Sequence, residues 1–257
     1  MLTIYDWFGY DLPVTERYRM IKQAGFDGAV LWWGNDYGQS DYRACPPLAR
    51  REGLFIENIH TPFNGINDLW LNNLGGEVMT DILLQCVTDC ATFEIPTMVM
   101  HLSSGETPPP FNGLGLDRVK RIAEAAENHS VSIALENLRK VEYLAFALGN
   151  IDSPRIGFCY DIGHRNCRNP NEDLLALYGP RLMALHLHDN DGSGDQHRLP
   201  FDGTIDWQAA MGAIAKEGYS GATALEVVNL GYEDLSAEGF LRVAFERAKR
   251  LKGLRWA

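Results

Sequence analysis

The sequence predicts a single (β/α)8 barrel, a TIM barrel, that spans residues 1–257 as one domain. The length of 257 residues matches the roughly 250 residues that such a barrel takes. Eight short apolar segments alternate with longer amphipathic ones, which is typical of a parallel sheet with crossover helices. An open doubly wound sheet usually carries a Gly-rich phosphate loop after an early strand, and here only Gly113 and Gly115 form a short Gly-x-Gly.

The predicted strands are continuous in apolar residues rather than alternating, as expected for a parallel sheet that is covered on both faces. In chain order they are Leu2–Trp7, Gly28–Trp33, Phe55–His60, Thr97–His101, Val131–Glu136, Arg155–Asp161, Leu182–His188 and Ala222–Val227.

The segments between these strands have charged faces and helix-ending signals. Gly25, Gly53 and Gly218 follow the last helical residues, where a left-handed stop is favoured, and Asp206 is a candidate N-cap. The predicted helices are Val14–Ala24, Asp41–Glu52, Val78–Phe93, Asp117–His129, Glu142–Leu148, Asn171–Tyr178, Asp206–Lys216 and Glu238–Leu251.

The composition is that of an ordinary globular protein, with 46% hydrophobic and 22% charged residues. No run approaches the roughly 18 apolar residues of a membrane span. No signal peptide is visible, so we expect a cytoplasmic protein without a membrane partner. The five cysteines form no CxxC pair, which argues against a disulfide framework. The formal net charge of -11 makes nucleic acid an improbable partner.

Metal-capable side chains end six successive predicted strands, from the third to the eighth. In a barrel these ends converge on one patch, and burying carboxylates with imidazoles is costly unless they are paired or bind a cation. Each side chain alone has an ordinary structural explanation, but their conjunction predicts a metal site. The residues are His60, His101, Glu136, Asp161 with His164, His186 with His188 and Asp189, and Glu226.

The ligand chemistry indicates a hard to borderline cation. Carboxylates and one imidazole suit Mn²⁺, Mg²⁺, Co²⁺ or Zn²⁺. Cys159 lies two residues before Asp161, on the same side of an ideal strand but one layer deeper, and is interpreted as a packing residue.

These motifs resemble the xylose isomerase-like barrel superfamily, which includes sugar isomerases, ketose 3-epimerases, inosose-processing enzymes and endonuclease IV. The resemblance covers nearly the whole chain and is specific for the superfamily, not for a substrate. Its strongest pieces are residues 134–137 (Ala-Leu-Glu-Asn), 161–164 (Asp-Ile-Gly-His), 186–190 (His-Leu-His-Asp-Asn) and the segment 195–207.

The resemblance implies two different ligand sets. In the epimerase and isomerase branch one metal ion is held at positions that match Glu136, Asp161, His186 and Glu226, and the residue matching His164 contacts substrate. In the endonuclease IV branch further ligands complete a cluster of three zinc ions. The matching candidates for two or three Zn²⁺ are His60, His101, His164, Asp195 and His197.

The preferred interpretation is a metal-dependent isomerase or epimerase that acts on a small-molecule sugar or cyclitol through an enediolate. Glu136 and Glu226 would be the catalytic acid and base. The candidate substrate-binding residues are His164, His188, Arg198, Trp33 and Phe63.

Three alternatives stay open from the sequence, and a homo-oligomer is compatible with all of them. A related sugar-acid lyase or dehydratase uses the same enolate chemistry. A multi-zinc phosphodiesterase like endonuclease IV would use the full ligand set, although the loop after His60 offers phosphate no cation. A non-catalytic binding barrel is the third alternative, and it would assign no function to the cluster of metal-capable residues at the strand ends.

Overall fold

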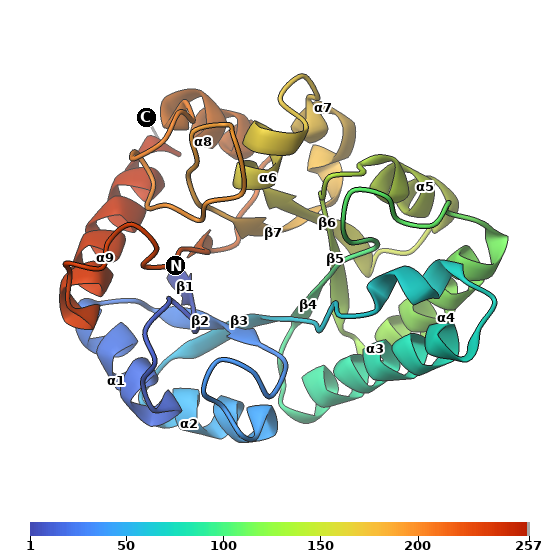
Figure 1. Ribbon diagram of the computed structural model, residues 1–257, viewed down its shortest axis with the longest axis horizontal. Coiled ribbons are helices and arrows are strands. Elements are labelled where there is room, and N and C mark those ends of the chain that lie inside the picture. The colour runs from blue at the N-terminus through green and yellow to red at the C-terminus, as the bar shows by residue number, and fades with distance from the viewer. Residues whose placement is uncertain (256–257) are drawn as a thin grey trace.

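Eight parallel strands form one sheet in the order β7-β6-β5-β4-β3-β2-β1-β8, surrounded by helices (Figure 1). The computed structural model describes residues 1–255. The ring closes past the end of β7, where Leu187 forms a parallel bridge with Leu225 and its N–H donates to the Ala224 carbonyl at 3.0 Å. The strands are β1 Leu2–Tyr5, β2 Gly28–Trp32, β3 Phe55–His60, β4 Thr97–Met100, β5 Ser132–Glu136, β6 Ile156–Asp161, β7 Leu182–His186 and β8 Thr223–Leu225.

The predicted barrel is therefore confirmed, and each predicted strand is present. Several strands end one or two residues earlier than predicted, because the chain leaves the sheet at the rim. Trp7, His101 and His188 consequently lie on the segments that follow β1, β4 and β7.

Helices connect the strands on the outside of the barrel (Figure 1). They are α1 Val14–Ala24, α2 Cys45–Arg51, α3 Leu74–Thr92, α4 Gly113–His129, α5 Glu142–Asn150, α6 Ile162–Arg168, α7 Leu174–Tyr178, α8 Trp207–Lys216 and α9 Ala237–Leu254, with short 3-10 turns η1 Tyr42–Ala44, η2 Ile66–Trp70 and η3 Gly179–Arg181. Of the helices within residues 1–255, none combines the length and the apolar character needed to span a membrane.

Asparagine caps explain two of the errors in the predicted helix boundaries. The helix predicted to begin at Val78 begins at Leu74, because the Asn73 side chain accepts a hydrogen bond from the Gly76 N–H at 2.8 Å. In the same way, the Asn112 side chain starts α4 at Gly113 rather than at Asp117.

Other caps agree with the prediction or define an element that it missed. Asp206 caps α8 by accepting from the Ala209 N–H, and Gly25, Gly53 and Gly218 all have positive φ angles, as predicted. Helix α6 was not predicted; Asp161 caps it by accepting from the His164 N–H at 2.6 Å.

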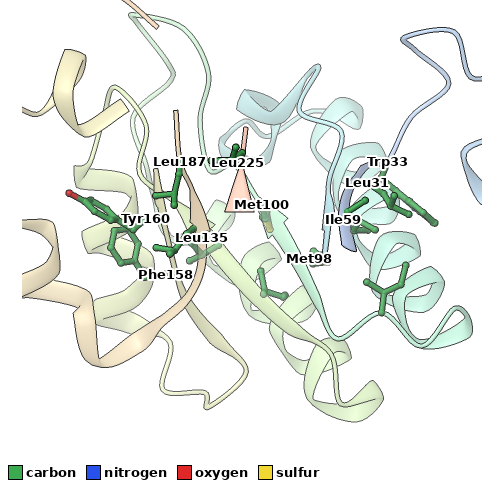
Figure 2. Close-up of a cluster of buried hydrophobic side chains, with 14 of the residues drawn as sticks. Leu31, Trp33, Ile59, Met98, Met100, Leu135, Phe158, Tyr160, Leu187 and Leu225 are labelled. Atoms are coloured by element: carbon green, nitrogen blue, oxygen red, sulfur yellow. The ribbon is translucent and has the colours of Figure 1, made fainter. Parts of the chain in front are cut away.

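The main apolar core lies between the sheet and the helices. Figure 2 shows side chains of this layer, among them Leu135 and Phe158. Because side chains alternate across a strand, the neighbours of Leu135 face the barrel interior. A smaller interior cluster is accordingly built from Val99, Ala134, Cys159 and Ala184, and Glu136 lies above it at the rim.

Candidate metal centre

Glu136 is the centre of a buried group of imidazoles at the carboxyl ends of the strands. Its Oε2 lies 3.2 Å from Nε2 of His101, 3.4 Å from Nε2 of His60 and 3.5 Å from Nδ1 of His186. Its Oε1 lies 2.9 Å from Nδ1 of His164. The Glu136 side chain is nearly inaccessible, so these four imidazoles replace the water that would otherwise solvate its charge.

Two further carboxylates, those of Glu226 and Asp161, approach His186. Nδ1 of His186 lies 2.8 Å from Oε2 of Glu226 and 3.8 Å from Oδ2 of Asp161. Yet both ring nitrogens of His186 are buried without a properly directed hydrogen bond. Carboxylates that crowd around an imidazole nitrogen without hydrogen-bond geometry fit ligands that share a cation. The four-residue ligand set predicted from the sequence is thus brought together.

Asp195 lies between two histidines, His164 and His197, beside the residues around Glu136 and His186. Its Oδ2 lies 3.1 Å from Nε2 of His164, and its Oδ1 lies 3.2 Å from Nε2 of His197. His197 has a positive φ of 45° and directs Nδ1 to the Glu226 carbonyl at 2.9 Å. A left-handed backbone is uncommon for a residue other than glycine, and such strain is often retained at functional sites.

His188 lies behind the ligand set and not in the open cavity. Its Nε2 lies 3.1 and 3.2 Å from the two oxygens of Asp161, and its ring stacks on His197 at 4.0 Å between centroids. The side chain is fully buried. His188 was predicted to contact substrate; in the structure it contacts Asp161 and does not belong to the residues that line the cavity.

A cavity of about 260 Å³ opens above the cluster, and both Glu136 and Glu226 line it. One wall is aromatic: Trp7 stacks on Tyr37 with centroids 4.8 Å apart, and Trp32 meets Phe63 edge to face at 5.6 Å. A second cavity of about 160 Å³ shares part of this lining and is bounded by Ser103, Ser104 and Arg139, among others.

Phe63 lines both cavities, but Trp33 and Arg198, which we expected beside it, do not reach them. Trp33 faces the outer core with Leu31 (Figure 2) and donates to Oδ2 of Asp89 at 3.0 Å. Since neighbouring side chains on a strand point to opposite faces, it is Trp32 that faces the cavity. Arg198 lines a separate surface hollow and pairs with Asp191 at 3.4 Å.

Sequence reasoning also missed Tyr5 and Tyr37 as lining residues. Tyr5 is the last residue of β1 and faces the barrel interior with Trp32, so the alternation of side chains along β1 could have identified it. Tyr37 lies in the loop after β2 with a positive φ of 54°, and no sequence pattern marks it.

The charges of the cluster support one another. Burial raises the pKa of Glu136, but the opposing effect of the neighbouring His101 and His186 is larger. The pKa of Glu136 therefore lies well below its usual range. For Glu226, burial is likewise outweighed by His186 and His197, which bring its pKa to about 2. Burial lowers the pKa of His197, whereas Asp195 and Glu226 raise it to about 9. Burial lowers the pKa of His101, whereas nearby carboxylates raise the pKa values of His164, His186 and His197. Without a metal ion, protons on these last three imidazoles supply positive charge beside the carboxylates.

The sequence model of the xylose isomerase-like TIM barrel matches residues 18–248. The chain belongs to the xylose isomerase-like TIM barrel family. Fructoselysine 3-epimerase of Shigella flexneri is 24% identical, over 93% of this chain and 94% of that protein. An uncharacterized protein of Sinorhizobium fredii is 27% identical, over 85% of this chain and 83% of that protein.

Solved structures share the xylose isomerase-like fold at low sequence identity. D-psicose 3-epimerase with D-tagatose, from Clostridium cellulolyticum, superposes with a TM-score of 0.77 at 14% identity, covering 100% of both chains. The IolI protein with a bound zinc atom superposes with a TM-score of 0.77 at 16% identity, covering 99% of this chain and 98% of that one. At these identities the likeness establishes the fold alone.

Proposed function

We propose that this protein is a divalent-metal-dependent epimerase or isomerase of a sugar or cyclitol. The observation that carries the proposal is that Glu136 and Glu226 line one cavity and both lie within 3.5 Å of Nδ1 of His186. A pair of carboxylates around one cation position, open to a small polar and aromatic cavity, suits proton transfer on a polyol. The names of the fructoselysine, psicose and tagatose epimerases among its relatives support the same reaction class.

Glu136, Asp161, His186 and Glu226 would hold the metal ion. Three carboxylates and one imidazole suit Mn²⁺, Mg²⁺, Co²⁺ or Zn²⁺. When bound, the ion would stabilise negative charge that develops on the substrate oxygens.

The two glutamates would exchange the proton on the carbon next to the substrate carbonyl. They come from β5 and from the segment after β8, so they reach the cavity from different parts of the rim. Their lowered pKa values keep both carboxylates ionised in the free protein, so either can accept the proton from the carbon. The other would deliver a proton to the opposite face only after it has taken one up from solvent. His164, whose Nδ1 lies 2.9 Å from Glu136, would orient that carboxylate and a substrate hydroxyl.

The aromatic wall would hold the rest of the substrate. Trp7, Tyr37, Trp32 and Phe63 present apolar ring faces and edges to the cavity. Such faces pack against the C–H bonds of a sugar ring and keep bulk water away from the reacting carbon.

Solvent exchange tests the proton transfer directly. The purified protein, loaded with Mn²⁺ or Co²⁺, is incubated with a panel of ketoses and inososes in D₂O, and deuterium at the carbons next to the carbonyl is followed by NMR. Deuterium incorporation that requires the metal and accompanies a new stereoisomer is the expected result. Absence of exchange with every member of the panel, from fully loaded protein, would contradict the proposal.

A multi-zinc phosphodiesterase is the second candidate, and a specific observation favours it. His60 and His101 lie against Glu136, and His164 and His197 lie against Asp195, so the additional ligands are also clustered. The lining described for the main cavity, however, includes no Lys or Arg, and Arg139 beside it pairs with Glu106 at 2.8 Å. Two or three Zn²⁺ per chain together with hydrolysis of bis(4-nitrophenyl) phosphate would favour this function over epimerisation.

A sugar-acid lyase or dehydratase would use the same glutamate pair. One carboxylate would remove the proton, and the other, after taking up a proton from solvent, would protonate a departing hydroxyl group. The NMR experiment distinguishes this reaction, because the product would have lost water instead of changing configuration.

A further inference from the structure

Cys159 lies in the barrel interior, one layer below the rim. It is on β6, two residues before Asp161, and its backbone is in register with Glu136 on the neighbouring strand β5. The side chain is fully buried. Its Sγ, one carboxylate oxygen of Glu136 and one ring nitrogen of His186 all lie within 4.8 Å of one another.

His186 supplies an independent indication that this interior position can hold an ion. Its side chain is 1% exposed, and neither ring nitrogen makes a well-directed hydrogen bond, although Nδ1 lies 2.8 Å from Oε2 of Glu226. Buried polar atoms without partners are rare and call for a ligand, an ion or water. His186 thus belongs to two overlapping groups, an outer one with Asp161 and Glu226 and an inner one with Cys159.

We propose that Cys159, Glu136 and His186 form a second, deeper cation position, which takes thiophilic divalent ions such as Co²⁺, Zn²⁺ and Cd²⁺. Sulfur ligands favour these ions over Mn²⁺ and Mg²⁺. A bound divalent ion deprotonates a coordinating thiol, and the proton leaves to solvent. Metal–sulfur and metal–nitrogen bonds of about 2.3 and 2.0 Å place ligand atoms less than 4.5 Å apart, so three atoms already within 4.8 Å need little movement.

The inner and outer positions compete for ligands, because both use Glu136 and His186. Cys159 lies below the lining of the cavity that Glu136 and Glu226 face. An ion in the inner position is therefore withdrawn from the substrate, and thiophilic ions compete with Mn²⁺ for the centre. The inference rests on the ligands of the proposed metal centre but not on the sugar reaction.

Cobalt spectroscopy tests the inner position without any substrate. The metal-free, full-length protein is titrated with Co²⁺ and its near-ultraviolet absorption is recorded, since thiolate ligation of Co²⁺ produces a charge-transfer band there. The wild-type protein should show the band, and a Cys159→Ala variant should lose it. A Cys86→Ala variant is the matched control, because Cys86 is equally buried but lies on α3, outside the barrel.

Two results would overturn the inner position: a wild-type protein that binds Co²⁺ without the band, or a Cys159→Ala variant that keeps it. If the alanine variant does not fold, Cys159→Ser preserves the side-chain size and still removes the thiolate. Addition of Mn²⁺ should diminish the wild-type band in proportion to the Co²⁺ it displaces. Loss of the band in Cys159→Ala combined with inactivity toward every sugar would reject the sugar reaction and leave the inner position standing.

Discussion

Nε2 of His188 lies 3.1 and 3.2 Å from the two carboxylate oxygens of Asp161, so one imidazole N–H is shared between both. Asp161 also accepts the His164 N–H at 2.6 Å as the cap of α6. The carboxylate is consequently fixed by the fold before any ion arrives. A ligand oriented in this way loses less freedom when it binds a metal ion.

Replacing His188 should weaken metal binding without changing the ligand set. We expect His188→Ala to lower metal affinity by about 10- to 100-fold, the usual effect of removing a residue that orients a ligand. Competition with a chromophoric chelator measures the affinity. Arg198→Ala is the control, because Arg198 lies in the same connection between β7 and α8, is partly exposed and forms an ion pair with Asp191. Equal metal affinities in the two variants would show that the contact of His188 with Asp161 does not contribute to metal binding.

The two glutamates should be indispensable for turnover. Glu136→Gln and Glu226→Gln keep the side-chain size but remove the charge and the proton-accepting group. Each should lower kcat by at least about 10²-fold, as expected for loss of general acid–base catalysis, while circular dichroism stays unchanged. Glu106→Gln is the control, since Glu106 is 72% exposed. Substantial activity in both glutamine variants would refute the mechanism.

The histidines beside Glu136 distinguish a single ion from a cluster. Nε2 of His60 lies 3.4 Å from Oε2 of Glu136, but His60 is not needed for the four-residue set around His186. With one ion per chain, His60→Ala should retain most of the metal and His186→Ala should lose it, by elemental analysis. Equal loss from both variants would instead indicate a cluster with two or three Zn²⁺.

The barrel could be predicted from the sequence because its signals are local and repeated. Each buried strand is a run of apolar residues, and a residue such as Glu136 at the end of one run already indicates the rim. The predicted ligands cluster because the carboxyl ends of parallel strands meet there. The clustering of His60, His101, Glu136, Asp161, His186 and Glu226 could therefore be predicted from strand order. Asp195 and His197 lie in the connection between β7 and α8, and they were expected only from the family resemblance.

The orientation of single side chains could not be predicted as well, since it depends on where each strand ends. Trp32 and Trp33 are adjacent, and only the observed register decides that Trp32 faces the cavity. Similarly, His188 lies beyond the last residue of β7, and its partner Asp161 is on another strand. Contacts between distant segments of this kind leave no pattern in a single sequence.

The charge of His197 predicts how pH affects the metal-free protein. Its pKa is raised from 6.5 to about 9 in the fold, so its contribution to stability is complete below pH 6.5 and is lost as pH rises through 9. The unfolding temperature of the chelator-treated protein should therefore fall over this range, and it should fall less in His197→Asn. Metal binding should respond in the opposite direction, becoming tighter toward pH 9 as protons leave the imidazoles. A wild-type unfolding temperature that rises from pH 6.5 to 9 would contradict this assignment.

Gly163 should be required for the contact between His188 and Asp161. A Cβ atom added at Gly163 would lie 1.9 Å from Cε1 of His188. That ring cannot move aside easily, because it is fully buried and stacks on His197. Gly163→Ala should therefore push the imidazole away from Asp161, destabilise the protein by about 1–3 kcal/mol as other overpacked cores are, and weaken metal binding.

A matched glycine variant separates this steric effect from helix propensity. Gly149 lies in α5, and nothing is within 4 Å of a Cβ added there. Gly149→Ala should therefore stabilise the protein by up to about 0.5–1 kcal/mol, as the replacement of a helical glycine does, and leave metal binding unchanged. Chemical denaturation and chelator competition on both variants measure the two effects. Should Gly163→Ala behave like Gly149→Ala in both assays, the His188 ring must have room to move, and its contact with Asp161 would not control the geometry of the metal centre.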